Sequence, residues 1–467
     1  MQRPGNFQFR FEILLLFVVL EVVLFGANST LQLIVTIAEY LFLLYVILFK
    51  EKEIGIMYFL TFTLLSLGLE NYGTISTLPP TFWGFRVMGF SFNILFSILV
   101  LIICLVSDNF KWSMKKISRE NKFLLFFILY SSFVGLIYIL LLDNYIDNFK
   151  QDILTYYPFF IYLYLLSFLN KESTIKIIKY GFALTVIMMV LSLITHKMMQ
   201  YGLGNYFVLQ NSFAYIMIVA IFMMKDFYNR WVYFGLILTM LFLLVNGNIF
   251  IGGKQIILFI VVLIWILITY WKSTPFFALG VLISVFFLKP IFQIAINHYM
   301  GSIISFKLTQ VYSILDNINF TSLAKTKSSI GNIIAEGITL YHYEINNILI
   351  LFFGKGFGGG IPDLFGYLGP WAGSSGYAAH DLLRNDFHKL HLPIFEILLK
   401  SGIIGLILYS VLIIKMFLKK NMFTFLSLLM LATVFYVNKE QLLLTMIFLK
   451  IANETEYKRT HETSMIK

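Results

Sequence analysis

A run of histidine and arginine side chains in the C-terminal third of the chain could bind an anion and exchange a proton. His380, Arg384, His388 and His391 are spaced at i, i+4, i+8 and i+11. If residues 380–391 form one helix, this spacing puts all four side chains on one face and builds a cationic stripe. A histidine among them would titrate near neutral pH. The stripe predicts a site for an anionic ligand with a histidine available as a base, although a solvated helix at a membrane surface would show the same spacing.

A glycine-rich segment lies upstream of this stripe. Gly354, Gly356 and Gly358 belong to the run Gly-Lys-Gly-Phe-Gly-Gly-Gly at residues 354–360. Backbone amides without side-chain obstruction can form an anion-binding nest, so we expect these glycines to contribute to substrate binding. The segment lacks the Gly-Lys-Ser/Thr ending of the nucleotide-binding P-loop. A glycine-rich turn that holds no ligand is the alternative.

The composition indicates what kind of structure must position these residues. Of the 467 residues, 59% are apolar and 13% are charged, whereas soluble domains have about 45–50% apolar and about 25% charged residues. This difference excludes a soluble enzyme, a disordered tail and a secreted disulfide scaffold. We expect an all-α, polytopic integral membrane protein with one large outer loop and about 14 transmembrane helices, or 12 at the fewest. The expected spans are 11–26, 31–49, 55–69, 91–107, 123–142, 152–169, 180–195, 206–224, 231–250, 255–271, 275–296, 392–416, 421–437 and 441–452.

Lysine and arginine are concentrated in alternate connections between these spans. Five of them lie between residues 111 and 122 alone. The positive-inside rule assigns that side to the cytoplasm, so the net charge of +11 reflects topology rather than nucleic-acid binding. We expect eleven transmembrane helices in residues 1–296, a large outer loop with the active site in residues 297–390, and three further helices with a cytoplasmic tail in residues 391–467.

The stretch His391-Leu-Pro-Ile-Phe-Glu-Ile-Leu-Leu-Lys-Ser-Gly-Ile-Ile-Gly405 resembles the signature of the bacterial O-antigen polymerase and O-antigen ligase superfamily. In that signature a histidine, usually followed by asparagine, ends a long periplasmic loop, and Glu and Gly-x-x-Gly follow on the next span. Here Leu392 replaces the asparagine. Residues 353–358 are similar to the Gly-x-Gly-Phe-Gly element of that loop. Gly252-Gly-Lys254-Gln resembles the Ser-Arg-Gly element, with lysine where arginine is commoner.

The resemblance implies a glycosyltransferase of the bacterial inner membrane whose active site faces the periplasm. A polymerase would transfer a growing glycan from undecaprenyl diphosphate to a lipid-linked repeat unit, and a ligase would transfer it to the lipid A core. Preorganised cations would stabilise the departing diphosphate. We expect His391 and Arg384 to be catalytic, with His391 acting either as a base or as a diphosphate ligand. The expected substrate-binding residues are Lys254, Arg86, His388, His380, Gly354, Gly356 and Gly358.

The resemblance also implies the molecules that the protein meets. These are the lipid bilayer, the undecaprenyl-diphosphate-linked oligosaccharide, a flippase and a chain-length regulator, and no nucleic acid. We expect no cofactor and no metal, because no Asp-x-Asp pair lies in the expected outer segments to hold one. A lipid-linked oligosaccharide flippase or transporter is the alternative from a different class. Such carriers have two similar halves with short loops, whereas five of the seven histidines here lie between residues 298 and 391.

Overall fold

The computed structural model describes residues 8–24, 29–65, 86–87, 90–107, 119–141, 144–194, 200–201, 204–205, 207–208, 249–250, 324–325, 329–368, 377, 379–418, 422–434 and 439–465. Most of these residues are helical. The first half of the chain contributes α1 (Phe11–Leu24), α2 (Ser29–Phe49), α3 (Lys52–Leu65), α4 (Phe92–Ser107), α5 (Arg119–Leu141), α6 (Ile146–Tyr156), α7 (Pro158–Leu166) and α8 (Lys171–Ile194). The second half contributes α15 (Ser329–Ile345), α16 (Ile348–Phe353), α17 (Ala379–Arg384), α18 (Pro393–Leu418), α19 (Met422–Val434) and α20 (Lys439–Met465).

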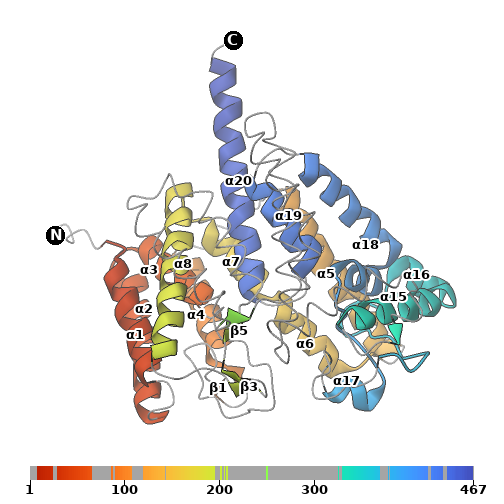
Figure 1. Cartoon of the computed structure of the whole chain (residues 1–467). Helices are drawn as coiled ribbons and strands as arrows, with labels where there is room; N and C mark the ends of the chain where they lie inside the picture. The colour runs from red at the N-terminus through yellow and green to blue at the C-terminus, as the bar shows by residue number, and fades with distance from the viewer. Residues whose placement is uncertain are drawn as a thin grey trace, which may run out of the picture. The chain divides into compact units, whose positions relative to one another are not determined.

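One compact unit consists of residues 1–114, 159–256 and 453–467. In it, α1, α2, α3 and α8 pack against one another (Figure 1). The apolar side chains of α3 are buried from Ile54 to Leu64, which makes this helix the centre of the unit. Asn170 caps α8, because its Oδ1 accepts a hydrogen bond from the backbone N–H of Ser173 at 2.9 Å.

Six two-residue strands form three short pairs in the same unit. β1 (Arg86–Val87) pairs with β2 (Phe90–Ser91) and β3 (Gln200–Tyr201) with β4 (Gly204–Asn205), both antiparallel. β5 (Phe207–Val208) pairs in parallel with β6 (Ile249–Phe250). β5 and β6 fall inside the spans expected at 206–224 and 231–250, so these two positions are extended where we predicted helix. The rest of the four spans expected between residues 206 and 296 lies outside the described residues.

The second unit consists of residues 115–158 and 257–452 and contains the expected site. Its centre is α18, against which α5, α16 and α19 pack. Figure 1 shows the short α16 beside α18. Pro393 is the first residue of α18, a position where its missing N–H costs nothing. The helix is interrupted at Gly402, whose φ of 62° is one that glycine adopts without strain.

Among the residues that the structure describes, two helical stretches are long and apolar enough to cross a membrane. They are Glu120–Leu141 in α5 and Pro393–Leu418 in α18, and shorter apolar helices occur at Phe11–Leu20, Leu33–Phe49 and Leu95–Ser107. The span expected at 152–169 is wrong as a single helix. Pro158 ends the hydrogen-bonding pattern of α6 and starts α7, and α6 is largely polar with Asn148 and Asp152 buried.

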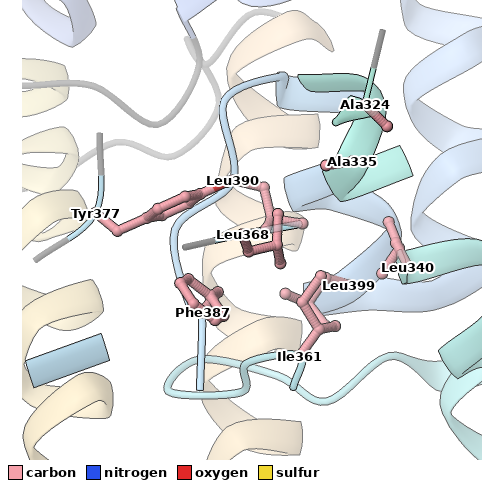
Figure 2. Close-up of a cluster of buried hydrophobic side chains, with 9 residues drawn as sticks. All are labelled: Ala324, Ala335, Leu340, Ile361, Leu368, Tyr377, Phe387, Leu390 and Leu399. Atoms are coloured by element: carbon pink, nitrogen blue, oxygen red, sulfur yellow. The ribbon is translucent and has the colours of Figure 1, made fainter. Parts of the chain in front are cut away.

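The described part of the expected outer loop contains α15, α16 and α17 and shares a hydrophobic cluster with α18. Figure 2 shows that side chains from α15, from the segments on either side of α17 and from α18 converge there. Its members are Ala324, Ala335, Leu340, Ile361, Leu368, Tyr377, Phe387, Leu390 and Leu399. The cluster fixes the polypeptide on both sides of the histidine-rich segment at residues 380–391, since Tyr377 precedes that segment and Leu399 follows it. The residues that carry chemistry are therefore attached to a packed core.

Candidate active site

His391 is held by a fully buried carboxylate. Glu336 lies in the middle of α15 and has no exposed surface. Its Oε1 lies 2.6 Å from His391 Nδ1, and its Oε2 accepts a hydrogen bond from the His391 backbone N–H at 2.8 Å. Tyr377 donates its hydroxyl proton to the same carboxylate at 2.7 Å. One carboxylate thus receives three hydrogen bonds, two of them from a single histidine.

The surroundings of His391 fix its ring as well as its backbone. The Tyr377 ring meets the imidazole edge to face, with 5.3 Å between ring centroids. Glu396, in the first turn of α18, accepts a hydrogen bond from the backbone N–H of Leu390 at 3.1 Å. The His391 side chain keeps 18% of its surface exposed. It lies at the edge of the packed cluster with one side towards solvent.

This arrangement has a chemical consequence for the imidazole. A carboxylate that accepts the Nδ1 proton of a histidine fixes the tautomer whose lone pair is on Nε2, and it stabilises the imidazolium that forms when Nε2 takes up a proton. Burial strengthens the interaction, because hydrogen bonds are electrostatically stronger in the low-dielectric protein interior. A hydrogen bond to an ionised group is in addition about twice as strong as a neutral one. The Glu336–His391 pair can therefore accept a proton from a hydroxyl group.

The predicted stripe on one helix face is wrong. α17 ends at Arg384, and Asn385 follows with a φ of 50°. The backbone N–H of Asp386 returns to the carbonyl of Asp381 at 3.1 Å, which closes the helix in a Schellman-type turn. His388 and His391 consequently lie beyond the helix. The sequence has the i+4 spacing, but Asn385 adopts the left-handed conformation and the helix ends at Arg384, so the spacing does not place the later histidines on its face.

His388 and Arg384 have different environments. His388 is 1% exposed, and its Nδ1 lies 2.8 Å from Asp381 Oδ1. Arg384 is partly exposed, lies 3.5 Å from Asp147 Oδ2 and stacks over the Tyr145 ring, with 4.6 Å from Cζ to the centroid. The His388 side chain is thus enclosed by protein, whereas the guanidinium of Arg384 is accessible to a ligand.

The glycine-rich segment does not form the predicted anion nest. Its amides donate to protein groups: Lys355 N–H to the Leu399 carbonyl at 2.7 Å, Gly356 N–H to the Lys400 carbonyl at 3.0 Å, and Phe357 N–H to the Ser131 carbonyl at 2.7 Å. Gly358 N–H donates to Asp152 Oδ2 at 2.7 Å. These glycines allow backbone approach instead. A Cβ on Gly356 would overlap the backbone of Gly135 in α5, and the φ of Gly356 is 69°.

A buried lysine joins three parts of the unit. Lys400 of α18 has no exposed surface, and its Nζ donates to Asp152 Oδ2 of α6 and to the Gly359 carbonyl, both at 2.8 Å. Glu396 Oε1 lies 3.9 Å from the same Nζ. Since Glu396 also holds the backbone just before His391, this cluster of Lys400, Asp152 and Glu396 connects the glycine-rich segment, α6 and the start of α18.

Two further carboxyl groups outside the candidate spans are perturbed by burial. Burial raises the pKa of Glu344, at the end of α15, to about 8. Burial also raises the pKa of Asp386, and the neighbouring Lys355 and Lys400 lower it in part. Within the described part of the chain, Glu344 Oε1 has no hydrogen-bond partner. Glu344 therefore carries a proton at neutral pH.

Only some of the residues that the sequence singled out are described in the second unit. His391, His388, Arg384 and the three glycines belong to the second unit. The side chains of Arg86, in β1, and His380, in α17, are not described, and Lys254 lies outside the described residues altogether.

The sequence analysis did not predict the side chains that hold His391 and the glycine-rich segment in place. Lys400 and Glu396 carried a recognisable signal, because they are ionisable residues at i and i+4 in an apolar run, and such residues pair with one another. Asp152 carried a weaker one, at the start of another apolar run. Glu336 carried none, because it lies 55 residues before His391 and no local pattern connects the two.

Comparison of the chain with protein-family models, with curated proteins and with solved structures finds no match. The chemistry of this site therefore has to be inferred from its own residues.

Proposed function

We propose that the protein is a polysaccharide repeat-unit polymerase of the bacterial inner membrane. It transfers a growing glycan from undecaprenyl diphosphate to a lipid-linked repeat unit on the periplasmic side. The proposal includes about 14 transmembrane helices, with residues 297–390 forming the large periplasmic segment. The observation that carries it is the Glu336–His391 pair, at the residue where the resemblance to the polymerase and ligase superfamily begins. The two candidate spans, Glu120–Leu141 and Pro393–Leu418, support the membrane location.

The reaction can be written with the residues of this site. A hydroxyl group of the acceptor sugar gives its proton to Nε2 of His391, and its oxygen attacks the anomeric carbon of the donor glycan. The bond between that carbon and the phosphate oxygen breaks, and undecaprenyl diphosphate leaves with the electron pair. Glu336 stabilises the imidazolium that results. General-base assistance of this kind contributes about 10²–10⁴-fold to a rate.

Arg384 is the cation proposed to stabilise the leaving diphosphate. Its guanidinium is partly exposed and its partner Asp147 is itself exposed, so a diphosphate can replace this weak surface ion pair. Arginine binds phosphate oxygens through two parallel N–H donors, which favours it over lysine at such a site. Lys254, Arg86 and His380 remain sequence-based proposals for the same ligand. The glycine amides are left out, because they already donate to protein groups.

Two alternatives use the same lipid-linked substrate. A ligase would need the same base and the same cation but would use the lipid A core as its acceptor. A flippase would not need a base. The exposed side of His391, held in one tautomer, favours a transferase over a flippase.

Deletion of the gene in the host separates these functions. Loss of a polymerase should leave surface lipid with a single repeat, loss of a ligase should leave polymer that never reaches lipid A, and loss of a flippase should leave no surface repeat. Complementation with His391→Ala or Arg384→Ala should not restore chain growth. Leu383→Ala is the matched control, because Leu383 is exposed and lies next to Arg384. Full-length polymer attached to lipid A in the deletion strain would refute all three functions.

A further inference from the structure

Helix α16 exposes an apolar surface inside the segment that we expected to lie outside the membrane. The helix has the sequence Ile-Leu-Ile-Leu-Phe-Phe, and Ile348, Leu349, Phe352 and Phe353 are exposed while Ile350 is buried. An exposed, contiguous apolar surface of this kind marks contact with a membrane or another protein. The depth of α16 along the neighbouring helices decides between them.

Contacts at the C-terminal end of α16 place it beside the middle of α5. The Phe353 carbonyl accepts a hydrogen bond from the Tyr130 hydroxyl at 3.1 Å, and the Phe357 N–H donates to the Ser131 carbonyl at 2.7 Å. Ser131 is separated by ten residues from Leu141, where the apolar stretch ends. Ten residues correspond to about 15 Å of helix, which is half of a hydrocarbon core of about 30 Å.

The same segment also reaches well into α18. Lys355 N–H donates to the Leu399 carbonyl, and a Cβ on Gly402 would overlap the Phe352 carbonyl. Gly402 is nine residues from Pro393, about 14 Å along the helix. α5 and α18 therefore place the end of α16 at the same depth independently.

The backbone of the following segment meets the requirement that hydrocarbon imposes on non-helical chain. Such backbone is tolerated at membrane depth only where protein satisfies its polar groups. The amides of residues 355–358 all donate to protein acceptors, and the Lys355 carbonyl accepts from Asn144 Nδ2 at 2.9 Å. A solvent-exposed loop would not need a protein acceptor for each of these four amides.

We infer that residues 348–358 re-enter the bilayer from the outer side, with the exposed face of α16 against lipid acyl chains and the glycine-rich segment enclosed between α5 and α18. The inference rests on the membrane location in the proposed function and not on glycosyl transfer. It refines the proposed topology, because part of the large outer segment then lies within the membrane.

Single cysteines test this inference in the purified full-length chain. Cys104, the only cysteine, is buried and is first replaced by alanine. Leu349→Cys, Ile414→Cys and Leu383→Cys are then introduced separately at exposed leucine and isoleucine positions of α16, α18 and α17. Each variant is labelled with bimane and reconstituted in phosphatidylcholine vesicles with or without brominated acyl chains.

We expect brominated lipid to quench bimane both at 349 and at 414, and not at 383. Quenching at 414 alone would overturn the re-entrant inference and leave the membrane location intact. Absence of quenching at 414 and 349 would overturn both. Protection of residue 349 from a membrane-impermeant maleimide without quenching would mean that protein covers α16, which also contradicts the inference. If Leu349→Cys fails to fold, Ile348→Cys on the same exposed face replaces it.

Discussion

Replacing Glu336 with glutamine should slow glycosyl transfer far more than it destabilises the protein. Glutamine keeps the shape of the side chain but cannot accept hydrogen bonds on both ends. If its oxygen takes the place of Oε1, its NH₂ group faces the His391 backbone N–H, 2.8 Å from Oε2 in the native structure. If it takes the opposite orientation, its NH₂ group donates to His391 Nδ1 and forces the ring proton onto Nε2, which then cannot act as a base.

Either orientation has a defined cost. A buried donor left without an acceptor costs about 1–3 kcal/mol, which sets the expected loss of stability. The second orientation removes the correct tautomer, and both orientations remove the negative charge that stabilises the imidazolium, so the transfer rate should fall by about 10²–10⁴-fold. In serine proteases, the equivalent change of carboxylate to amide costs about 10⁴-fold.

Initial rates of glycan extension by purified protein in vesicles measure this effect, and thermal unfolding of the same samples measures stability. Tyr377→Phe is the matched control, because it removes one of the three hydrogen bonds to Glu336 and leaves the histidine bonds in place. It should cost about 1 kcal/mol, which is at most about a tenfold change in rate. A Glu336→Gln enzyme as fast as wild type, beside an inactive His391→Ala, would refute the base and leave His391 as a diphosphate ligand.

Three further changes test the structure around the site. Lys400→Met should destabilise the protein by about 3–5 kcal/mol in thermal or denaturant unfolding, because it leaves Asp152 buried without its cation; unchanged stability would mean that the pair is not buried. Gly356→Ala should prevent normal accumulation of the protein in the membrane, whereas Gly366→Ala should be tolerated much better. Both glycines have a φ near 70°, but a Cβ on Gly356 would overlap the backbone of Gly135, and a Cβ on Gly366 would have no atom within 4 Å. Similar accumulation of both variants would contradict the close approach of Gly356 to α5. The raised pKa of Glu344 predicts that the free energy of unfolding falls by up to about 1.4 kcal/mol per pH unit as pH rises from 4.5 to about 8, because the unfolded state releases the proton first. Glu344→Gln should remove this pH dependence. An identical pH dependence in the variant would show that Glu344 is not the titrating group.

The apolar runs that the structure describes in full form helices as predicted, except the run at 152–169. Glu120–Leu141 and Pro393–Leu418 are long runs with little competing polarity, so hydropathy alone predicts both the helix and its length. The run at 152–169 failed because Pro158 divides it, and that residue was visible in the sequence. Where a single residue type dictates the backbone, as Asn385 does at the end of α17, the spacing of neighbouring side chains is a weaker guide.

The chemistry of the site was only partly predictable. His391 and Arg384 could be predicted from the spacing of histidine and arginine in residues 380–391 and, for His391, from the resemblance to the polymerase and ligase superfamily. Their partners could not, because the contact between Glu336 and His391 depends on how α15 packs against α18. Hydrophobic residues in the cluster around Leu390 decide that packing, and their pattern does not specify which polar residues meet. Long-range pairing of this kind follows from tertiary structure rather than from local sequence.

The most direct measurement incubates the purified protein in vesicles with a defined undecaprenyl-diphosphate-linked repeat unit, in the presence of a metal chelator and without nucleotide. We predict a ladder of lipid-linked glycans, with one undecaprenyl diphosphate released for each new glycosidic bond, and no ladder with His391→Ala. An unextended repeat unit after incubation with folded wild-type protein, or a ladder that His391→Ala forms equally well, would contradict the proposed polymerase.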